Sequence, residues 1–67
     1  MEKLEAVQKV LRFSNAVREW CEKDQNVYFD DFDEQNVQDY EDGYADLADK
    51  IIECGIEEGL LEEDEVQ

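Results

Sequence analysis

The chain has 67 residues, of which 42% are hydrophobic and 40% are charged, and its formal net charge is −15. A chain of this length forms at most one domain and buries only about 60% of its unfolded surface. It contains no apolar run near the roughly 18–20 residues that span a bilayer. Residues 1–12 mix charged and apolar side chains and lack the core of a signal peptide. These features predict a soluble, cytoplasmic protein with one small core.

The negative charge is concentrated in the C-terminal two thirds. Seventeen of the 21 acidic residues follow Lys23, where the only basic residue is Lys50. Residues 24–67 therefore carry −16, whereas residues 1–23 carry +1. Such one-sided charge produces a strong negative potential and destabilises a compact state by self-repulsion. The pattern indicates a positively charged partner.

The first predicted helix covers residues 2–23. Its apolar residues recur in steps of three and four, as in an amphipathic helix with a wide buried face. They are Leu4, Val7, Val10, Leu11, Phe13, Val17, Trp20 and Cys21. The stretch consists mostly of good helix formers and has no Gly or Pro.

The following connector, beginning at Asp24, breaks this period. Val27, Phe29 and Phe32 are expected to fold back onto the core. Residues 27–31 alternate like a short strand, but no second strand is available to pair with them, so a loop is favoured.

The second predicted helix covers residues 33–54. A heptad seam defines it through Val37, Tyr40, Tyr44, Leu47, Ile51 and Cys54. Either Asp31 with Glu34 or Asn36 with Asp39 can cap its start. Gly43 is placed inside this helix, where it would allow close helix approach. Gly55 is expected at its left-handed C-terminus.

The predicted fold is all-α: an antiparallel two-helix hairpin closed by a short third helical turn around Ile56, Leu60 and Leu61. Residues 1–61 form the single domain, and residues 62–67 form a solvated acidic tail. A homodimer remains an option because small helical pairs gain core by self-association. The hairpin places the Cys21 and Cys54 sulfurs about 25 Å apart, too far for an internal disulfide. Both cysteines are interpreted as small buried hydrophobes.

A row of carboxylates forms a second stripe on the second predicted helix. Its members, spaced three and four residues apart, are Asp39, Asp42, Asp46, Asp49 and Glu53. Like charges at this spacing repel, and only Lys50 relieves them. The row is either an ordinary solvent-exposed face or a regular series of charges that binds a basic surface. Its axial repeat of about 5 Å is sparser than the 3.4 Å between the phosphates of one DNA strand.

Further acidic and aromatic residues surround this row. Asp30, Asp31 and Asp33 lie in the connector, where Tyr28 and Phe32 flank them. Aromatic side chains among carboxylates are good anchors on Arg-rich surfaces. The expected partner-binding residues are therefore Tyr28, Asp30, Asp31, Phe32, Asp33, Asp39, Asp42, Asp46, Asp49 and Glu53.

In size, charge and carboxylate arrangement, the chain resembles small acidic phage counter-defence proteins. These include anti-CRISPR proteins, inhibitors of restriction enzymes and the uracil-DNA glycosylase inhibitor. The resemblance implies a non-enzymatic inhibitor that binds the basic nucleic-acid-binding surface of a defence or DNA-processing protein in a host cytoplasm. It carries over no individual site residue.

Other chemistry has less support. Asp31, Asp33, Gln35 and Asp42 fit four positions of a calcium loop, but Asn36 stands where that loop requires Gly. The chain has no His, and its only serine, Ser14, has no activating residue nearby in sequence. No enzyme, metal site or cofactor is predicted, and the charge opposes direct nucleic-acid binding. The basic residues of the first helix are expected to face the acids of the second.

Two alternatives stay open. The apolar seam, rather than the charge, could recruit a partner helix. The two cysteines could instead serve a regulatory metal or redox role.

Overall fold

A computed structural model describes residues 1–66, which contain four α-helices, one 3-10 turn and no strand. The elements are α1 (Lys3–Phe13), α2 (Asn15–Asp24), the turn η1 (Phe29–Asp31), α3 (Glu34–Gln38) and α4 (Ala45–Glu57). The prediction of an all-α chain is confirmed. No helix within the described part of the chain has both the length and the apolar character needed to cross a bilayer.

The first predicted helix is wrong in one respect: it is broken at Ser14. The backbone of Ser14 is extended, and its N–H donates to the Val10 carbonyl at the end of α1. Its hydroxyl oxygen then accepts from the Val17 N–H, 3.3 Å away, and so caps the start of α2. One residue thus ends one helix and begins the next, which lets the chain change direction.

The second predicted helix is also wrong, because residues 39–44 are not helical. The short α3 begins with Asp33 as its N-cap, and its carboxylate accepts from the Asn36 N–H at 2.7 Å. A turn follows, in which the Tyr44 N–H donates to the Asn36 carbonyl at 2.7 Å. Gly43 lies in this turn, where a Cβ would collide with the Asn36 carbonyl oxygen. Its role is a tight turn rather than close helix packing.

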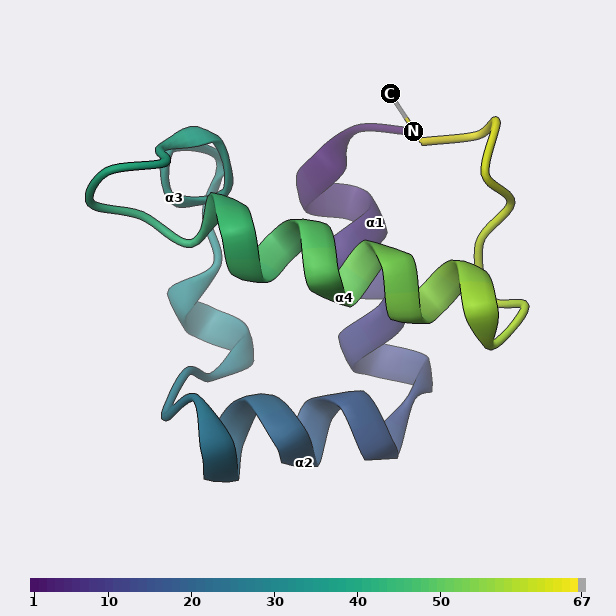
Figure 1. Ribbon diagram of the computed structural model, residues 1–67, viewed down its shortest axis with the longest axis horizontal. Helices are drawn as coiled ribbons and strands as arrows, with labels where there is room; N and C mark the ends of the chain where they lie inside the picture. The colour runs from purple at the N-terminus through teal and green to yellow at the C-terminus, as the bar shows by residue number, and fades with distance from the viewer. Residues whose placement is uncertain (67) are drawn as a thin grey trace.

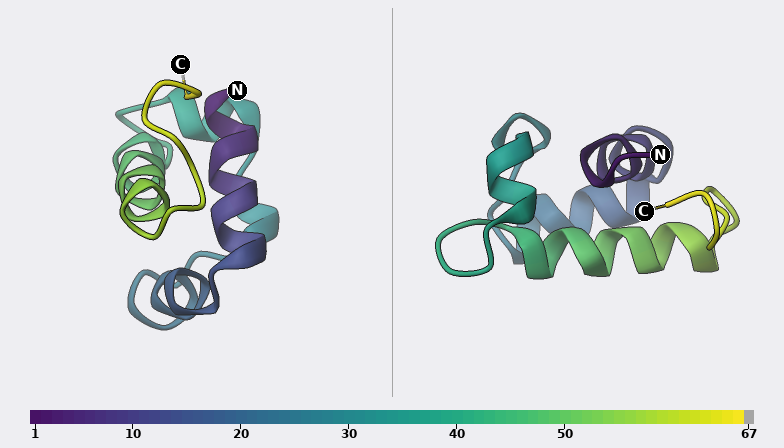
Figure 2. Two further views of the ribbon diagram at one scale, coloured as in Figure 1. Left: turned by 90° about the vertical axis from the view of Figure 1, so that its right-hand side faces the viewer. Right: turned by 90° about the horizontal axis from the view of Figure 1, so that it is seen from above.

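The helices enclose a small core instead of pairing as a hairpin. In Figure 1, α4 crosses in front of α1, and α2 lies beyond the end of α1 and runs in the opposite direction to α4. The left view of Figure 2 shows α2 and α4 nearly end-on, with α1 upright beside α4 and leading down into α2. The main packing is between α1 and α4, with α3 against both.

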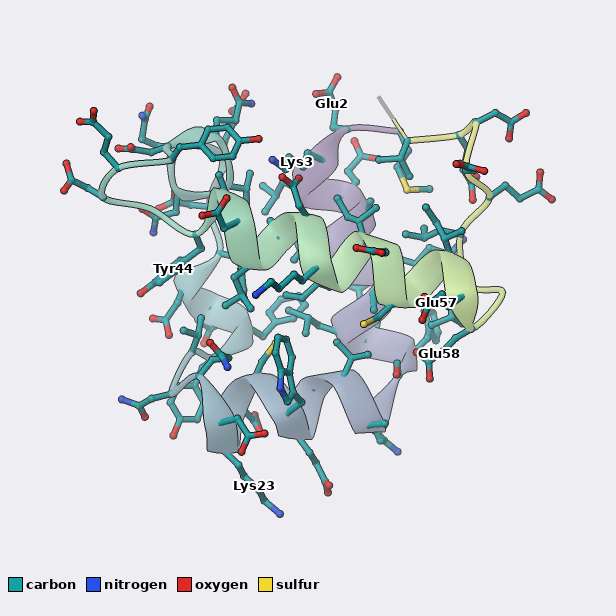
Figure 3. The ribbon with its side chains drawn as sticks, viewed as in Figure 1. Glu2, Lys3, Lys23, Tyr44, Glu57 and Glu58 are labelled. Carbon is teal, nitrogen blue, oxygen red and sulfur yellow. The ribbon has the colours of Figure 1, made fainter. Side chains whose placement is uncertain are left out.

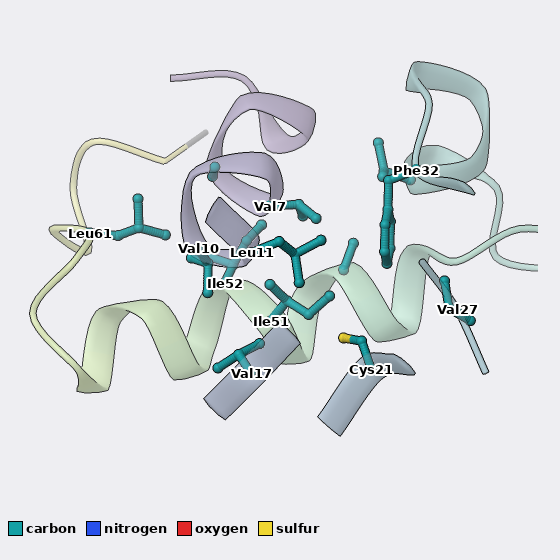
Figure 4. Close-up of a cluster of buried hydrophobic side chains, with 13 residues drawn as sticks. Val7, Val10, Leu11, Val17, Cys21, Val27, Phe32, Ile51, Ile52 and Leu61 are labelled. Carbon is teal, nitrogen blue, oxygen red and sulfur yellow. The ribbon is translucent and has the colours of Figure 1, made fainter. Parts of the chain in front are cut away.

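Figure 4 shows the buried cluster to which all four helices contribute. Its fully buried members include Val7, Val10 and Leu11 from α1 and Ile51 from α4. Truncating such a side chain to Ala costs about 2–5 kcal/mol. The connector contributes Val27 and Phe32, while Phe29 packs partly buried against the cluster, so the prediction that these residues fold back is confirmed.

Small residues let α4 approach α1 closely. Gly55 is buried inside α4, rather than at its end, and a Cβ there would collide with Val10 Cγ2. The glycine that ends the helix is Gly59, with φ of +79°. The apolar residues after α4 then turn back, so that Leu61 is buried and Leu60 packs partly buried on the core.

The acidic segment after Leu61 is tied to the start of the chain. The N-terminal ammonium donates to the Glu65 carbonyl at 2.6 Å, and Val66 packs partly buried against the core. Residues 62–64 are exposed. The solvated tail was predicted for residues 62–67; its last residue, Gln67, lies outside the described residues.

Candidate functional site

Four carboxylates form a ridge along the outer side of α4: Asp46, Asp49, Glu53 and Glu57. All four residues are exposed, and their spacing of three and four places them within one face of the helix. Figure 3 labels Glu57 of this face, at the C-terminal end of α4 beside Glu58. We call these residues the α4 ridge. It retains three of the five members of the predicted row.

Asp49 is the one ridge residue held in an ion pair within residues 1–66. Lys3 Nζ lies 2.8 Å from Asp49 Oδ1, and the Tyr40 hydroxyl donates to Asp49 Oδ2 at 3.2 Å. The Lys3 ammonium also lies 5.2 Å from the centre of the Tyr40 ring. Burial alone would lower the pKa of Lys3, but the hydrogen bond and charge of Asp49, together with Tyr40, raise it. The group ties α1 and the 39–44 turn to α4.

The other two members of the predicted row lie off the helix, in the turn before α4. Asp39 is half-buried, and its Oδ1 accepts from the backbone N–H groups of Glu41 (2.9 Å) and Asp42 (3.1 Å). Asp42 is exposed. The row is therefore not one continuous helical stripe, because the helix on which it was placed is interrupted at residues 39–44.

The connector aspartates also act on the backbone. Asp31 Oδ2 accepts from the Tyr28 N–H at 2.8 Å, and Asp33 caps α3. Asp30 is exposed. Asp31, Asp33 and Asp39 together are called the capping aspartates here. Each accepts a hydrogen bond from at least one backbone N–H group that would otherwise lack a partner.

The two predicted aromatic anchors are placed differently. Tyr28 is 51% exposed, as an anchor requires, whereas Phe32 is only 4% exposed. Phe32 packs against Tyr44 with ring centres 5.6 Å apart. The expectation that Phe32 meets a partner is wrong, because its side chain fills the core beneath the connector. The sequence also did not indicate Phe13 and Tyr40 as exposed residues, at 63% and 64%.

Few of the carboxylates form an ion pair with a basic side chain. Within residues 1–66 the ion pairs are Lys3 with Asp49 and Arg18 with Glu22, the latter 3.6 Å apart on α2. The expectation that the basic residues of the first helix face acids of the second is met by Lys3, whereas Arg18 pairs within its own helix. Arg12 instead lies 6.0 Å from the centre of the Phe29 ring. Most of the negative charge remains without a counter-charge from the described chain.

A groove between α2 and α4 was not predicted. It has a volume of about 500 Å³ and is lined by Ala16, Val17, Trp20, Lys50, Glu53, Cys54, Glu57 and Glu58. We call it the α2–α4 groove. At one end the Ser14 hydroxyl donates to Glu58 Oε2 at 2.8 Å, which joins the start of α2 to the end of α4. No spacing within the sequence indicates this groove, because it forms only when the break at Ser14 brings α2 beside α4.

The thiols of Cys21 and Cys54 are free. Burial raises the pKa of Cys21 to about 11, and the charges of Cys54 and Glu22 add to the shift. Burial, followed by Glu57, Glu58 and Glu53, raises the pKa of Cys54. The predicted placement of the sulfurs at opposite ends of a hairpin is wrong, since Cys21 belongs to the buried cluster and Cys54 packs against the same cluster. The thiolate, and not the neutral thiol, is the nucleophile and the metal ligand. Because the pKa of each cysteine is raised, both stay in the protonated, unreactive form near neutral pH.

The described residues form no group of three or more carboxylates, thiols or imidazoles that could hold a metal ion. Ser14 is 6% exposed, and its hydroxyl is engaged as a helix cap and with Glu58. No protein-family model matches the chain, and no curated protein or solved structure matches it either.

Proposed function

We propose that this protein is a non-enzymatic inhibitor that binds the basic nucleic-acid-binding surface of another protein, with carboxylates in the place of phosphates. The observation that supports this most is the α4 ridge, where four exposed carboxylates share one face of a helix. Only Asp49 among them has an ion-pair partner in the described chain. A ridge optimised for stability alone would carry interspersed cations.

The length of the ridge covers several phosphates of a DNA strand. Asp46 and Glu57 are separated by about 16 Å along the helix axis, at 1.5 Å per residue. Over that length one DNA strand carries about five phosphates. The four carboxylates of the ridge are about 5.5 Å apart along the axis and so are sparser than these phosphates, while the exposed Asp42 adds charge from the turn before α4. A surface of this kind attracts a basic groove at long range and at low salt.

The alternative of a partner helix recruited by the heptad seam loses its support. Val37 and Ile51 are fully buried within the chain, and Tyr44, Leu47 and Cys54 are half-buried. Only Tyr40 of the seam is well exposed. The seam residues are used in the fold and leave no continuous apolar stripe for a partner.

Capture from a cell lysate tests the proposal. The immobilised protein is expected to retain nucleic-acid-binding proteins at about 50 mM salt, to lose them by about 200 mM, and to release them to duplex DNA. A variant with Asp46→Lys, Glu53→Lys and Glu57→Lys should retain none of them. A matched variant with Glu62→Lys, Glu63→Lys and Asp64→Lys changes the net charge equally and should retain them. Capture that DNA does not displace, or that the ridge variant preserves, would overturn the proposal.

The homodimer is a separate proposal, and the net charge of −15 opposes it. Any dimer should therefore form more readily as salt screens the two chains from each other. Sedimentation equilibrium at low and high salt measures this, and a monomer mass in both would exclude a dimer under these conditions.

A further inference from the structure

We propose that the α2–α4 groove is a docking site for an arginine-bearing segment of a protein partner, in which an apolar side chain flanked by arginines enters the groove. The segment's arginines would lie against the carboxylates along the α4 side of the groove. This site goes beyond the ridge: it adds an apolar contact to a surface that otherwise binds through charge.

The floor of the groove is apolar and unfilled. Among the residues that line it, Val17 is buried, and Trp20 and Cys54 are half-buried. The space exists because α2 contributes the small side chain of Ala16 and α4 contributes the small side chain of Cys54. A volume of about 500 Å³ is within the range of small-ligand sites and accommodates one or two side chains of a partner.

The edge of the groove selects for positive charge. Glu53, Glu57 and Glu58 line it with Lys50 as the only cation, so carboxylates outnumber ammonium groups three to one. Cys54 lines the groove together with these three carboxylates, and burial followed by their charges raises the pKa of its thiol. An apolar ligand without positive charge would leave these charges uncompensated.

Arginine fits these walls better than lysine does. Its aliphatic stem packs on apolar surface while its planar guanidinium stacks on an aromatic face and bonds carboxylates in pairs. Trp20 belongs to the residue type with the strongest aromatic face for a cation, and Glu53 and Glu57 supply carboxylates in the same lining. The occupant is therefore a segment of protein with arginine on both sides of an apolar residue.

The groove shares Glu53 and Glu57 with the α4 ridge, so one partner can engage both. Binding in the groove does not require that this partner bind nucleic acid. The two proposals can therefore fail separately: DNA competition tests the ridge, whereas a synthetic peptide tests the groove.

The test uses a short Gly/Ser peptide with Arg-Leu-Arg at its centre and follows the fluorescence of Trp20, the only tryptophan in the chain. A saturable change in its emission is expected. Replacing the Leu by Ser should weaken binding about tenfold or more, since burial of a leucine side chain is lost. Replacing both Arg by Glu should abolish binding. A Ser peptide that binds as tightly as the Leu peptide would overturn the proposal, because binding would then depend on charge alone and not on an apolar contact in the groove.

Two variants of the protein locate the site. Ala16→Leu fills the groove at an exposed position without changing any charge and should abolish the fluorescence response while the circular dichroism spectrum is unchanged. Glu53→Gln with Glu57→Gln should weaken binding, whereas Glu63→Gln with Asp64→Asn removes the same charge and should not. Wild-type affinity in both Ala16→Leu and Glu53→Gln/Glu57→Gln, measured by calorimetry, would place the peptide elsewhere and overturn the proposal.

Discussion

Asp33 and Asp39, before α4, turn their carboxylates toward backbone N–H groups, whereas the carboxylates of the α4 ridge face solvent. The two sets have the same chemistry and come from the same acidic stretch of sequence. In the first set the carboxylate oxygens stabilise the chain by accepting hydrogen bonds at turns and helix starts. In the second set the negative charge destabilises the isolated helix through like-charge repulsion.

This difference separates folding from recognition. Carboxylates that serve as caps are replaceable by any short side chain with an acceptor oxygen, whether charged or not. Carboxylates that serve recognition are replaceable only by other anions. Substitution by the matching amide therefore distinguishes the two sets: it should preserve the function of a capping carboxylate and abolish that of a recognition carboxylate.

Among the carboxylate substitutions, Asp39→Ala is expected to have the largest effect on stability. It removes the acceptor of two backbone N–H groups, those of Glu41 and Asp42, and loosens the turn that leads into α4. We expect the free energy of unfolding in urea to fall by about 2 kcal/mol. Asp39→Asn keeps an acceptor oxygen and should recover most of this loss. Equal losses in the two variants would show that the charge of Asp39, rather than its hydrogen bonds, stabilises the turn.

Asp33→Ala is expected to cost about 1 kcal/mol, the usual value of a helix N-cap. The carboxylate accepts one N–H, that of Asn36, at the start of a helix of only five residues. Asp33→Asn should be nearly neutral because Asn caps as well as Asp does. Urea unfolding at neutral pH measures both, and binding of a captured partner should survive both. A loss of binding in a fully folded Asp33→Asn protein would move this residue into the recognition set.

The overall class was predictable from the sequence because it depends on periodicity. The spacing of Val7, Val10 and Leu11 identified a helix and its buried face correctly. The break at Ser14 was not predictable from that spacing, since Val17 and Cys21 continue the same period beyond it. The one local signal was the serine itself, a preferred N-cap, and such a preference is weak beside a strong apolar pattern.

In the second half the apolar pattern was misleading. The large residues Tyr40, Tyr44 and Leu47 defined a seam, but α4 buries the small residues Ala45, Ala48 and Gly55 along with Ile51 and Ile52. Close approach to α1 requires small side chains in α4, and this requirement cannot be recognised until the two helices are placed together.

The candidate site was likewise predictable only in part. The acidic character of the surface was predictable, whereas the division into capping aspartates and ridge depends on backbone hydrogen bonds that spacing does not reveal.

Asp49 belongs to the ridge but also has a counter-ion, so it should show an intermediate effect. We expect a coupling energy below about 1 kcal/mol between Lys3 and Asp49, because the Asp49 side chain is 53% exposed. A double-mutant cycle with Lys3→Gln and Asp49→Asn, measured by urea unfolding, gives this value. The raised pKa of Lys3 sets the pH dependence: the coupling is fully present below pH 10.5 and is lost as pH rises through the raised value. Equal coupling at about pH 7 and 9 is therefore expected, and no coupling at either pH would exclude the pair as a stabilising contact.

The smallest expected effect measures the potential of the ridge directly, with Cys54 as an internal probe. After burial, Glu57, Glu58 and Glu53 are the groups that raise the pKa of this thiol. Glu53→Gln with Glu57→Gln should therefore lower its pKa and speed its alkylation by iodoacetamide a few-fold near neutral pH, because the thiolate is the reactive form. Mass spectrometry separates this site from Cys21, which is buried and has a pKa of about 11.

The matched control for this experiment is Asp31→Asn with Asp33→Asn, which removes the same formal charge from the capping set. Neither residue contributes to the pKa of Cys54, so the alkylation rate should stay at the wild-type value. The difference between the two variants should also shrink as salt is added, since the ridge faces solvent and its field is screened. If both variants accelerated alkylation equally, the negative potential would be a property of the whole chain, and the distinction between ridge and caps would have no electrostatic basis.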